Sequence, residues 1–275
     1  MVAGSSPVDR PFLLSMTWIE AFILGIVQGA TEFFPISSSA HLKLAKLLFG
    51  IEDNGAHQIF NLFCHLGTLV ALVSVFRKEI FDLFFTERKK LLHFILALLP
   101  LIPGYFVLHP FLCAVSTPAF LGAFLLVTSG ILFLGNRCQN LSEEKKPFRD
   151  ALYIGSAQVL ALIPGISRSA STICCARFLG WTPKEAVRFS FLLSVPTIFG
   201  GSSLELFRLF YLKLPSNTSV LECSIGFFSS FIMGMALIRF SLYWLEKGVL
   251  KPFAWYCLVI GTLTLIFFCE PILIK

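Results

Sequence analysis

Charged residues are scarce in this chain of 275 residues, where Asp, Glu, Lys and Arg together make up 14%. Soluble domains carry about 25%. In addition, 56% of the residues are hydrophobic, and a soluble globule of this size could not keep so much apolar surface from water. We therefore expect an integral membrane protein, and an all-α one, because helices satisfy their own backbone hydrogen bonds in lipid.

Three other features are missing. The eight cysteines include no C-x-x-C pair, which argues against a structural metal site or a disulfide framework. The net charge of +6 is spread over loops and forms no basic domain, so we expect no nucleic-acid partner. Residues 1–16 lack the basic start and the cleavage site of a secretory signal, and they are interpreted as an N-terminal tail.

The chain contains an internal repeat. When residues 155–180 are aligned with residues 25–50 without a gap, seven of the 26 positions are identical. The identical pairs are Gly25/Gly155, Gln28/Gln158, Ile36/Ile166, Ser37/Ser167, Ser39/Ser169, Ala40/Ala170 and Gly50/Gly180. The copies differ in chemistry, because the first carries Glu32 and His41 whereas the second has Arg168 in place of Ser38.

Each copy predicts a pair of short helices that enters and leaves the membrane on one side. About 20 apolar residues are needed to cross a bilayer, and each helix of a pair is too short to do so alone. We expect an inverted-topology repeat in which each half is one re-entrant helix pair plus three transmembrane helices. The first half, 17–135, has its pair at 17–50 and spans at 59–76, 91–108 and 117–135. After a linker at 136–150, the second half, 151–275, has its pair at 151–180 and spans at 185–207, 221–244 and 252–272.

Lysine and arginine counts predict the orientation. Loop 77–90 has five of these residues and the linker 136–150 has four, whereas the turn 109–116 has none. Because cytoplasmic loops are enriched in positive charge, we expect the linker in the cytoplasm and both termini outside. The pair at 17–50 then enters from the outer side, and the pair at 151–180 from the cytoplasm.

The first pair carries an acid, a hydroxyl group and a base. Gln28 and Glu32 are four residues apart, on one helix face. A carboxylate inside a membrane costs at least ~2.5 kcal/mol to insert, so Glu32 is expected either to fix the re-entrant backbone or to hold a divalent cation or a proton. His41, three residues after Ser38, is a candidate base for a hydroxyl nucleophile.

The second pair carries the candidate anion site. Arg168 lies between Ser167 and Ser169 at the start of an apolar helix, where guanidinium donors, hydroxyl groups and free backbone amides can converge on phosphate oxygens. The repeat places Ser37 and Ser39 at the equivalent positions of the first pair. The alternative, an arginine that only sets topology, fits poorly between two apolar segments.

Four stretches of the chain resemble a known family. QGATEFFPISSSAH, PGISRSAS, FSFLLSVP and KPFAWY are similar to motifs of the undecaprenyl-diphosphate phosphatases of the bacitracin-resistance type, and the likeness covers residues 17–272. The resemblance implies a hydrolase of the bacterial plasma (inner) membrane that removes the terminal phosphate of undecaprenyl diphosphate at the outer side, with Mg²⁺ or Ca²⁺. Such an enzyme recycles the lipid carrier of peptidoglycan synthesis, which supports cell-wall biogenesis and cell shape, and it gives bacitracin resistance.

The resemblance also implies roles for single residues. By motif, Gln28 and Glu32 fall on the family's acidic pair, Ser38 and His41 on its serine and histidine, and Arg168 on its phosphate-binding arginine. Departures from the family pattern are Ala40 and Ala170 for glycine, Asn61 for an acidic residue, His65 for glutamine and Cys257 for arginine. Asn61 and His65 share one face of the first span and either line the site or pack structurally.

The expected mechanism is attack of Ser38 on the terminal phosphorus, with His41 taking its proton or protonating the leaving group. Arg168, with Ser167 and Ser169, and a Mg²⁺ or Ca²⁺ ion held by Glu32, with Gln28 as a further candidate ligand, then neutralise the phosphoryl oxygens. Direct attack by water is the alternative, and the sequence does not separate the two routes.

Two other functions compete with this one. A carrier or flippase for polyprenyl phosphate or another anion has the same inverted-repeat anatomy, but transport does not require Ser38 and His41. A lipid phosphatase with two catalytic histidines is excluded because no histidine follows Arg168. The expected partners are thus the lipid substrate and the membrane. Prenyl chain length and oligomeric state, with a homodimer as one alternative, stay open.

Overall fold

The computed structural model describes residues 16–51, 57–112, 115, 117–138, 147–212 and 218–268. Within these residues the chain forms helices and no strand, and six segments are long and apolar enough to cross a membrane. These spans are Gln58–Val75, Lys90–Leu112, Pro118–Arg137, Pro183–Tyr211, Val220–Leu245 and Lys251–Phe268. The prediction of an all-α integral membrane protein is confirmed, and each of the six predicted spans overlaps one of these segments.

Twelve α-helices and a short 3₁₀ helix are seen in the described ranges. The first half contains α1 (Trp18–Thr31), α2 (Ser38–Leu48), α3 (Gln58–Val75), α4 (Arg77–Phe85), α5 (Arg88–Leu98), α6 (Leu101–Leu112) and α7 (Pro118–Arg137). The second half contains α8 (Pro147–Val159), η2 (Leu160–Leu162), α9 (Arg168–Phe178), α10 (Pro183–Leu212), α11 (Val220–Leu245) and α12 (Lys251–Phe268). Four predicted segments lie partly outside the described residues: 1–15 of the tail, 113, 114 and 116 of the turn 109–116, 139–146 of the linker and 269–272 of the last span.

Two segments differ from the predicted organisation. The charged segment 77–90, expected as a loop, forms α4 and the start of α5. The predicted span 91–108 is divided between α5 and α6, with Leu99 and Pro100 between them. Proline lacks a backbone N–H and its ring clashes with the carbonyl four residues earlier, which accounts for the break at Pro100.

Several helix starts are specified by capping side chains. Thr17 and Glu20 form a reciprocal capping box at the start of α1, and Ser219 and Glu222 form another at the start of α11. In each box a hydroxyl oxygen accepts a free backbone N–H of the first turn, and the carboxylate accepts the N–H of the capping residue. These starts are therefore fixed locally, by residues three apart in the sequence.

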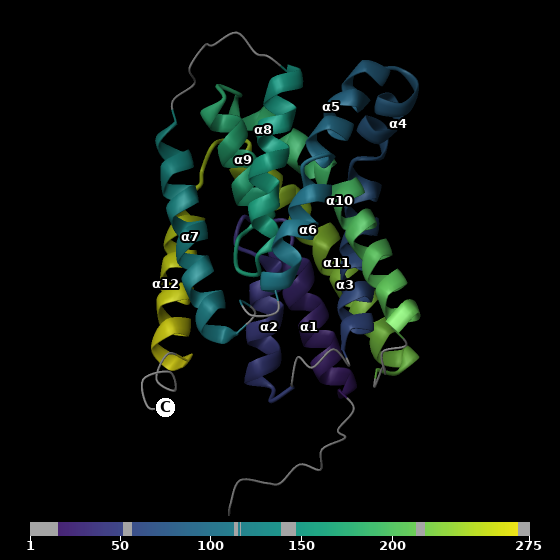
Figure 1. Cartoon of the computed structure of the whole chain (residues 1–275). Coiled ribbons are helices and arrows are strands. Elements are labelled where there is room, and N and C mark those ends of the chain that lie inside the picture. Colours follow the sequence, from purple (N-terminus) through teal and green to yellow (C-terminus); the bar gives the residue numbers. More distant parts are fainter. Residues whose placement is uncertain are drawn as a thin grey trace, which may run out of the picture.

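The two broken helix pairs occupy opposite ends of the molecule. Figure 1 shows α1 and α2 in the lower half and α8 and α9 in the upper half. Helix α1 packs on α11, α8 packs on α5, and α7 lies beside α12. In an inverted repeat α1 corresponds to α8 and α11 to α5 with α6, and these packing partners follow that correspondence. The inverted symmetry itself stays a prediction.

The glycines shared by the two repeats have matching structural roles. A Cβ atom at Gly25 would collide with Ser229 of α11, and one at Gly155 would collide with the Ala97 carbonyl of α5. Gly50 and Gly180, with φ of 69° and 84°, follow α2 and α9 in the left-handed region that favours glycine. The repeat is therefore preserved where two helices approach closely and where each re-entrant pair ends.

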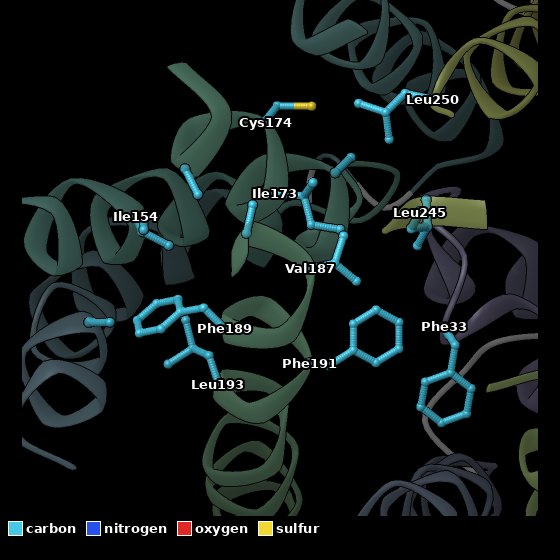
Figure 2. Close-up of a cluster of buried hydrophobic side chains, with 14 of the residues drawn as sticks. Phe33, Ile154, Ile173, Cys174, Val187, Phe189, Phe191, Leu193, Leu245 and Leu250 are labelled. Atoms are coloured by element: carbon cyan, nitrogen blue, oxygen red, sulfur yellow. The ribbon is translucent and has the colours of Figure 1, made fainter. Parts of the chain in front are cut away.

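A buried hydrophobic cluster supports the centre of the molecule. Figure 2 shows side chains of this cluster, among them Phe33 after α1, Ile173 of α9 and Phe191 of α10. The rings of Phe33 and Phe191 stack with centroids 6.0 Å apart. Ser241 of α11 also donates a 2.7 Å hydrogen bond to the Phe33 carbonyl. Because Phe33 is held on both sides, the residue before it, Glu32, is held as well.

Candidate active site

A cavity of about 730 Å³ lies where the two broken pairs meet. Most of the predicted site residues line it, namely Glu32, Ser37, Ser38, Ser39, Ser167, Arg168 and Ser169. Helix α3 adds Gln58, Asn61 and His65, helix α8 adds Gln158, and helix α10 adds Thr197, Ser202 and Glu205. Both halves of the chain thus build one polar cavity inside a membrane protein.

Glu32 is the centre of the hydrogen-bond network in this cavity. Its Oε1 accepts a bond from Arg168 Nη2 at 2.6 Å. Its Oε2 accepts bonds from Ser38 Oγ at 2.6 Å and Gln28 Nε2 at 2.9 Å. The Glu32 side chain is 4% exposed and that of Arg168 is 18% exposed. An acid, a cation and a hydroxyl group from both repeats therefore converge in a place from which water is largely excluded.

The backbone between α1 and α2 is held in an uncommon conformation. Helix α1 ends at Thr31, and Ser37 has a φ of 69°, which makes it the one non-glycine residue with positive φ among those described. Left-handed backbone in a non-glycine residue stores strain and is frequent at functional sites. At Ser37 this conformation starts α2 directly at Ser38, so the Ser38 hydroxyl group faces Glu32.

The equivalent loop before α9 is held by α7. Thr128 Oγ1 donates to the Gly165 carbonyl at 2.8 Å and accepts the Ser167 N–H at 3.0 Å. The Ser167 hydroxyl oxygen then caps α9 by accepting the Ala170 N–H at 3.3 Å. Arg168 is the first residue of α9. A helix N-terminus with free N–H groups favours anions, and here it accompanies a guanidinium group.

The predicted substrate-binding serines form two equivalent pairs. Ser37 Oγ lies 3.3 Å from Ser39 Oγ, and Ser167 Oγ lies 3.2 Å from Ser169 Oγ. Ser169 Oγ also donates to the Phe34 carbonyl at 3.3 Å, which joins α9 directly to the first loop. The four hydroxyl groups line the cavity on two sides and are in place to meet phosphate oxygens.

His41 has different partners from those that the sequence predicts. Its Nδ1 donates to the Ser37 carbonyl at 2.8 Å, and its Nε2 accepts a bond from Tyr256 Oη at 2.9 Å. It does not line the cavity, and the Ser38 hydroxyl group donates to Glu32 instead. These contacts are those of a residue that fixes the strained Ser37 and ties α2 to α12. Proton transfer between Ser38 and His41 stays a prediction.

Amide oxygens without partners provide candidate metal ligands. Gln28 Nε2 is used by Glu32 and by His65 Nδ1, 2.8 Å away, which leaves Gln28 Oε1 buried without a partner. Gln58 Oε1 and Asn61 Oδ1 are buried and unpartnered as well. Within the described residues no three His, Cys, Asp or Glu side chains form a metal-binding group. One carboxylate with amide and substrate oxygens nevertheless suits the hard cations Mg²⁺ and Ca²⁺.

Comparison with known proteins agrees with this site. Residues 21–263 match the family model described as Bacitracin resistance protein BacA. The chain belongs to this family. The undecaprenyl-diphosphatase of Protochlamydia amoebophila is 41% identical over 257 residues, which cover 92% of this chain and 99% of that protein. The undecaprenyl-diphosphatase of Halothermothrix orenii is 38% identical over 258 residues, which cover 91% and 98%. The family resemblance stated from the motifs is thereby confirmed.

Some residues of this BacA family site were not singled out from the sequence. Thr128 was not identified, because the sequence does not indicate which loop a polar side chain in an apolar span contacts. Tyr256 belongs to the KPFAWY motif, which pointed to the family but assigned no contact. Asn61 and His65, for which two interpretations were left open, line the cavity. Gln158 was recognised only as part of the repeat.

Proposed function

We propose that this protein hydrolyses undecaprenyl diphosphate to undecaprenyl phosphate and inorganic phosphate. The observation that carries the proposal is the partly buried, hydrogen-bonded cluster of Glu32, Ser38 and Arg168 in a cavity between membrane spans. Relatives that match nearly the whole chain carry the name undecaprenyl-diphosphatase, which supports the same reaction. The protein is thus a membrane hydrolase that acts on a phosphoric anhydride.

Arg168 is the residue that binds the terminal phosphoryl group. One of its terminal nitrogens, Nη2, is paired with Glu32, and the other, Nη1, is buried without a partner in the described part of the chain. Charge-assisted bonds from a guanidinium group to phosphate are roughly twice as strong as bonds between neutral groups. Placed in a water-poor cavity, Arg168 stabilises the negative charge that develops on the phosphoryl oxygens in the transition state.

Ser38 is placed as the nucleophile, with Glu32 as the acceptor of its proton. In this route the Ser38 oxygen bonds to the terminal phosphorus, the bridging P–O bond breaks, and undecaprenyl phosphate leaves. Water then cleaves the phosphoserine and releases phosphate. In the second route that fits the geometry, water attacks directly and Glu32 takes its proton. The 2.6 Å bond from Ser38 to Glu32 favours the first route.

A Mg²⁺ or Ca²⁺ ion fits the oxygen-rich side of the cavity. Glu32 would hold it together with Asn61 Oδ1, which belongs to a cavity-lining residue, and Gln28 Oε1 of the residue bonded to Glu32; these are two of the three buried amide oxygens on α1 and α3 that lack other partners. When bound, a divalent cation screens the charge of the diphosphate and polarises its oxygens. Arg168 and Glu32 are paired across the two halves of the chain. Because this pair fixes both side chains, they orient the lipid headgroup.

The location proposed for the enzyme is the bacterial plasma membrane, with the cavity opening to the outer side. The cavity reaches Gln58, the first residue of α3, and Glu205 near the end of α10. These positions lie toward the end of the molecule occupied by α1 and α2, away from the start of α8 (Figure 1). Since the positive charges predict a cytoplasmic linker before α8, the cavity mouth is on the opposite side. A reporter in 136–150 should be cytoplasmic and one in 109–116 external.

The direct test is phosphate release from a C55 diphosphate by the purified full chain in detergent. We expect release that a chelator stops and that Mg²⁺ or Ca²⁺ restores. Glu32→Gln serves as the inactive control and Glu20→Gln, at a half-buried capping residue that does not line the cavity, as the active control. Absence of release together with movement of polyprenyl phosphate across vesicles would replace the phosphatase by a carrier.

A further inference from the structure

Buried polar groups without partners divide the site into two sides. On α1 and α3 the unpartnered atoms are all amide oxygens, those of Gln28, Gln58 and Asn61. On α8 and α9 the cavity-lining residues with such atoms are Gln158 and Arg168, and both atoms are N–H donors, Nε2 and Nη1. Asp150 Oδ1 and Arg177 Nε are unpartnered on these helices as well, but these residues do not line the cavity. A buried polar group left unpaired costs free energy, so such atoms mark positions where a ligand completes the hydrogen bonding. The oxygens suit a cation, and the donors suit an anion.

Gln158 is the donor that the mechanism above does not use. It is 1% exposed, it lines the cavity, and it lies on α8 one residue before the helix ends. Its Oε1 lies 3.4 Å from Thr197 Oγ1, a long contact. The single hydroxyl proton of Thr197 is already donated to the Leu193 carbonyl at 2.7 Å. Thr197 therefore holds the Gln158 amide only weakly. A charged ligand in the cavity would determine whether the amide oxygen or the amide nitrogen faces it.

Comparison with the equivalent residue of the first repeat explains why this N–H is left over. Gln28 and Gln158 occupy the same repeat position. The Gln28 amide nitrogen is used by the Glu32 carboxylate, which can only accept hydrogen bonds. The residue equivalent to Glu32 in the second repeat is Leu162, which also lines the cavity. With no carboxylate beside it, the Gln158 amide nitrogen has no acceptor among the described residues.

We propose that Gln158 binds a phosphoryl oxygen of the substrate through its Nε2–H, beside Arg168 Nη1. This inference deepens the proposed function and rests on it. It makes Gln158 a substrate-binding residue and extends the anion-binding wall from the start of α9 onto α8. The two glutamines of the repeat then have opposite tasks, since Gln28 offers an oxygen to a cation and Gln158 offers an N–H to an anion.

The experiment compares two substitutions that separate loss of a donor from gain of a negative charge. In Gln158→Met the shape is nearly kept and the donor is lost, and KM for a C55 diphosphate should rise about tenfold, as expected for one hydrogen bond to a charged group. In Gln158→Glu the new carboxylate faces the phosphate, and KM should rise further. In both variants kcat should change less than KM, because the contact already exists in the ground state.

Matched controls separate this effect from a general loss of structure. Ser156→Ala changes an exposed residue of the same helix, whose hydroxyl bonds only its own backbone turn, and should leave KM unchanged. Monodispersity and thermal unfolding in detergent report on folding. If Gln158→Met or Gln158→Glu unfolds the protein, Gln158→Asn replaces it in the test. This variant keeps the amide group but shortens the side chain by one methylene group, and its KM should also rise.

The outcomes are distinct. Three results would each overturn the inference. The first is a KM of Gln158→Met equal to that of wild type, and the second is an equal rise of KM in Gln158→Met and Gln158→Glu. The third is a lower Mg²⁺ requirement in Gln158→Glu. Inhibition by inorganic phosphate identifies the group that is bound. An inhibition constant that rises with KM assigns the contact to the terminal phosphate, and an unchanged one assigns it to the phosphate that stays on the lipid. Wild-type phosphate release tests the proposed function separately.

Discussion

The two broken helix pairs share a backbone design and differ in charge. Both end in a left-handed glycine, both begin their second helix next to a pair of bonded serine hydroxyls, and both use a glycine to approach a neighbouring span. The first pair carries Glu32 and, four residues before it, the unpartnered amide oxygen of Gln28, whereas the second carries Arg168 and has unpartnered N–H donors on the cavity-lining residues Gln158 and Arg168. A duplicated scaffold thus supplies the opposite charges that a metal diphosphate requires.

This difference shows which positions of the repeat carry different chemistry in the two copies. The glycines at the close helix approaches and at the helix ends are the same in both copies, Gly25/Gly155 and Gly50/Gly180. Of the positions that face the cavity, the serine pairs are kept, whereas two charged positions have diverged, with Glu32 opposite Leu162 and Ser38 opposite Arg168 in the repeat alignment. Because the two loops meet at the cavity, a carboxylate and a guanidinium group from different halves form one partly buried ion pair. Neither half could form this site alone.

The largest effect should come from removing the acid of the first pair. Glu32→Gln should lower phosphate release by about 10³-fold or more at any practical Mg²⁺ or Ca²⁺ concentration, because it removes the partner of Arg168, the proton acceptor of Ser38 and the charged metal ligand. Purified protein and a C55 diphosphate provide the measurement, with membrane insertion checked in parallel. Retained activity would mean that the carboxylate is structural.

The cation of the second pair should come next. In Arg168→Lys the ammonium group keeps the charge but cannot pair with Glu32 and present a second donor in a fixed plane. We expect kcat to fall by about 10²–10³-fold. Arg188→Lys is the matched control, because Arg188 bonds Glu246 away from the cavity and should stay active. Near-normal turnover of Arg168→Lys would assign the arginine to topology or folding.

A smaller effect of opposite sign should follow from making the first pair more acidic. Gln28→Glu adds a second carboxylate beside Glu32 and should lower the Mg²⁺ or Ca²⁺ concentration for half-maximal activity a few-fold, because charge raises the affinity for hard cations. Metal titration of phosphate release checks this. An unchanged metal dependence would show that residue 28 does not coordinate the ion.

The smallest effect should come from the contact that supports the first pair from α12. Tyr256→Phe removes one hydrogen bond to His41 Nε2 and should cost about 1 kcal/mol of stability. Activity should stay within about fivefold of wild type if His41 only positions Ser37. A loss as large as that of Arg168→Lys would instead indicate that His41 takes part in proton transfer.

The sequence by itself determined the fold class and much of the site. Long apolar runs allow only helices in lipid, and the prolines at 35 and 164 interrupt two of these runs. The expected mechanism assigned Glu32 and Arg168 to the same phosphoryl group, and the two side chains are paired at 2.6 Å. These features depend on hydropathy and on local spacing, which can be read directly from the residues.

Only the tertiary structure decided how the polar groups are shared. The spacing of His41 and Ser38 suggested a proton transfer, but the packing of α12 beside α2 gives His41 the hydroxyl group of Tyr256 instead. Likewise, Gln28 and Gln158 are identical residues of the repeat, but their partners differ. Gln28 has an unpartnered oxygen, whereas Gln158 has an unpartnered N–H group. A side chain's partners come from helices distant in sequence, and their positions are set by the packing of the whole bundle.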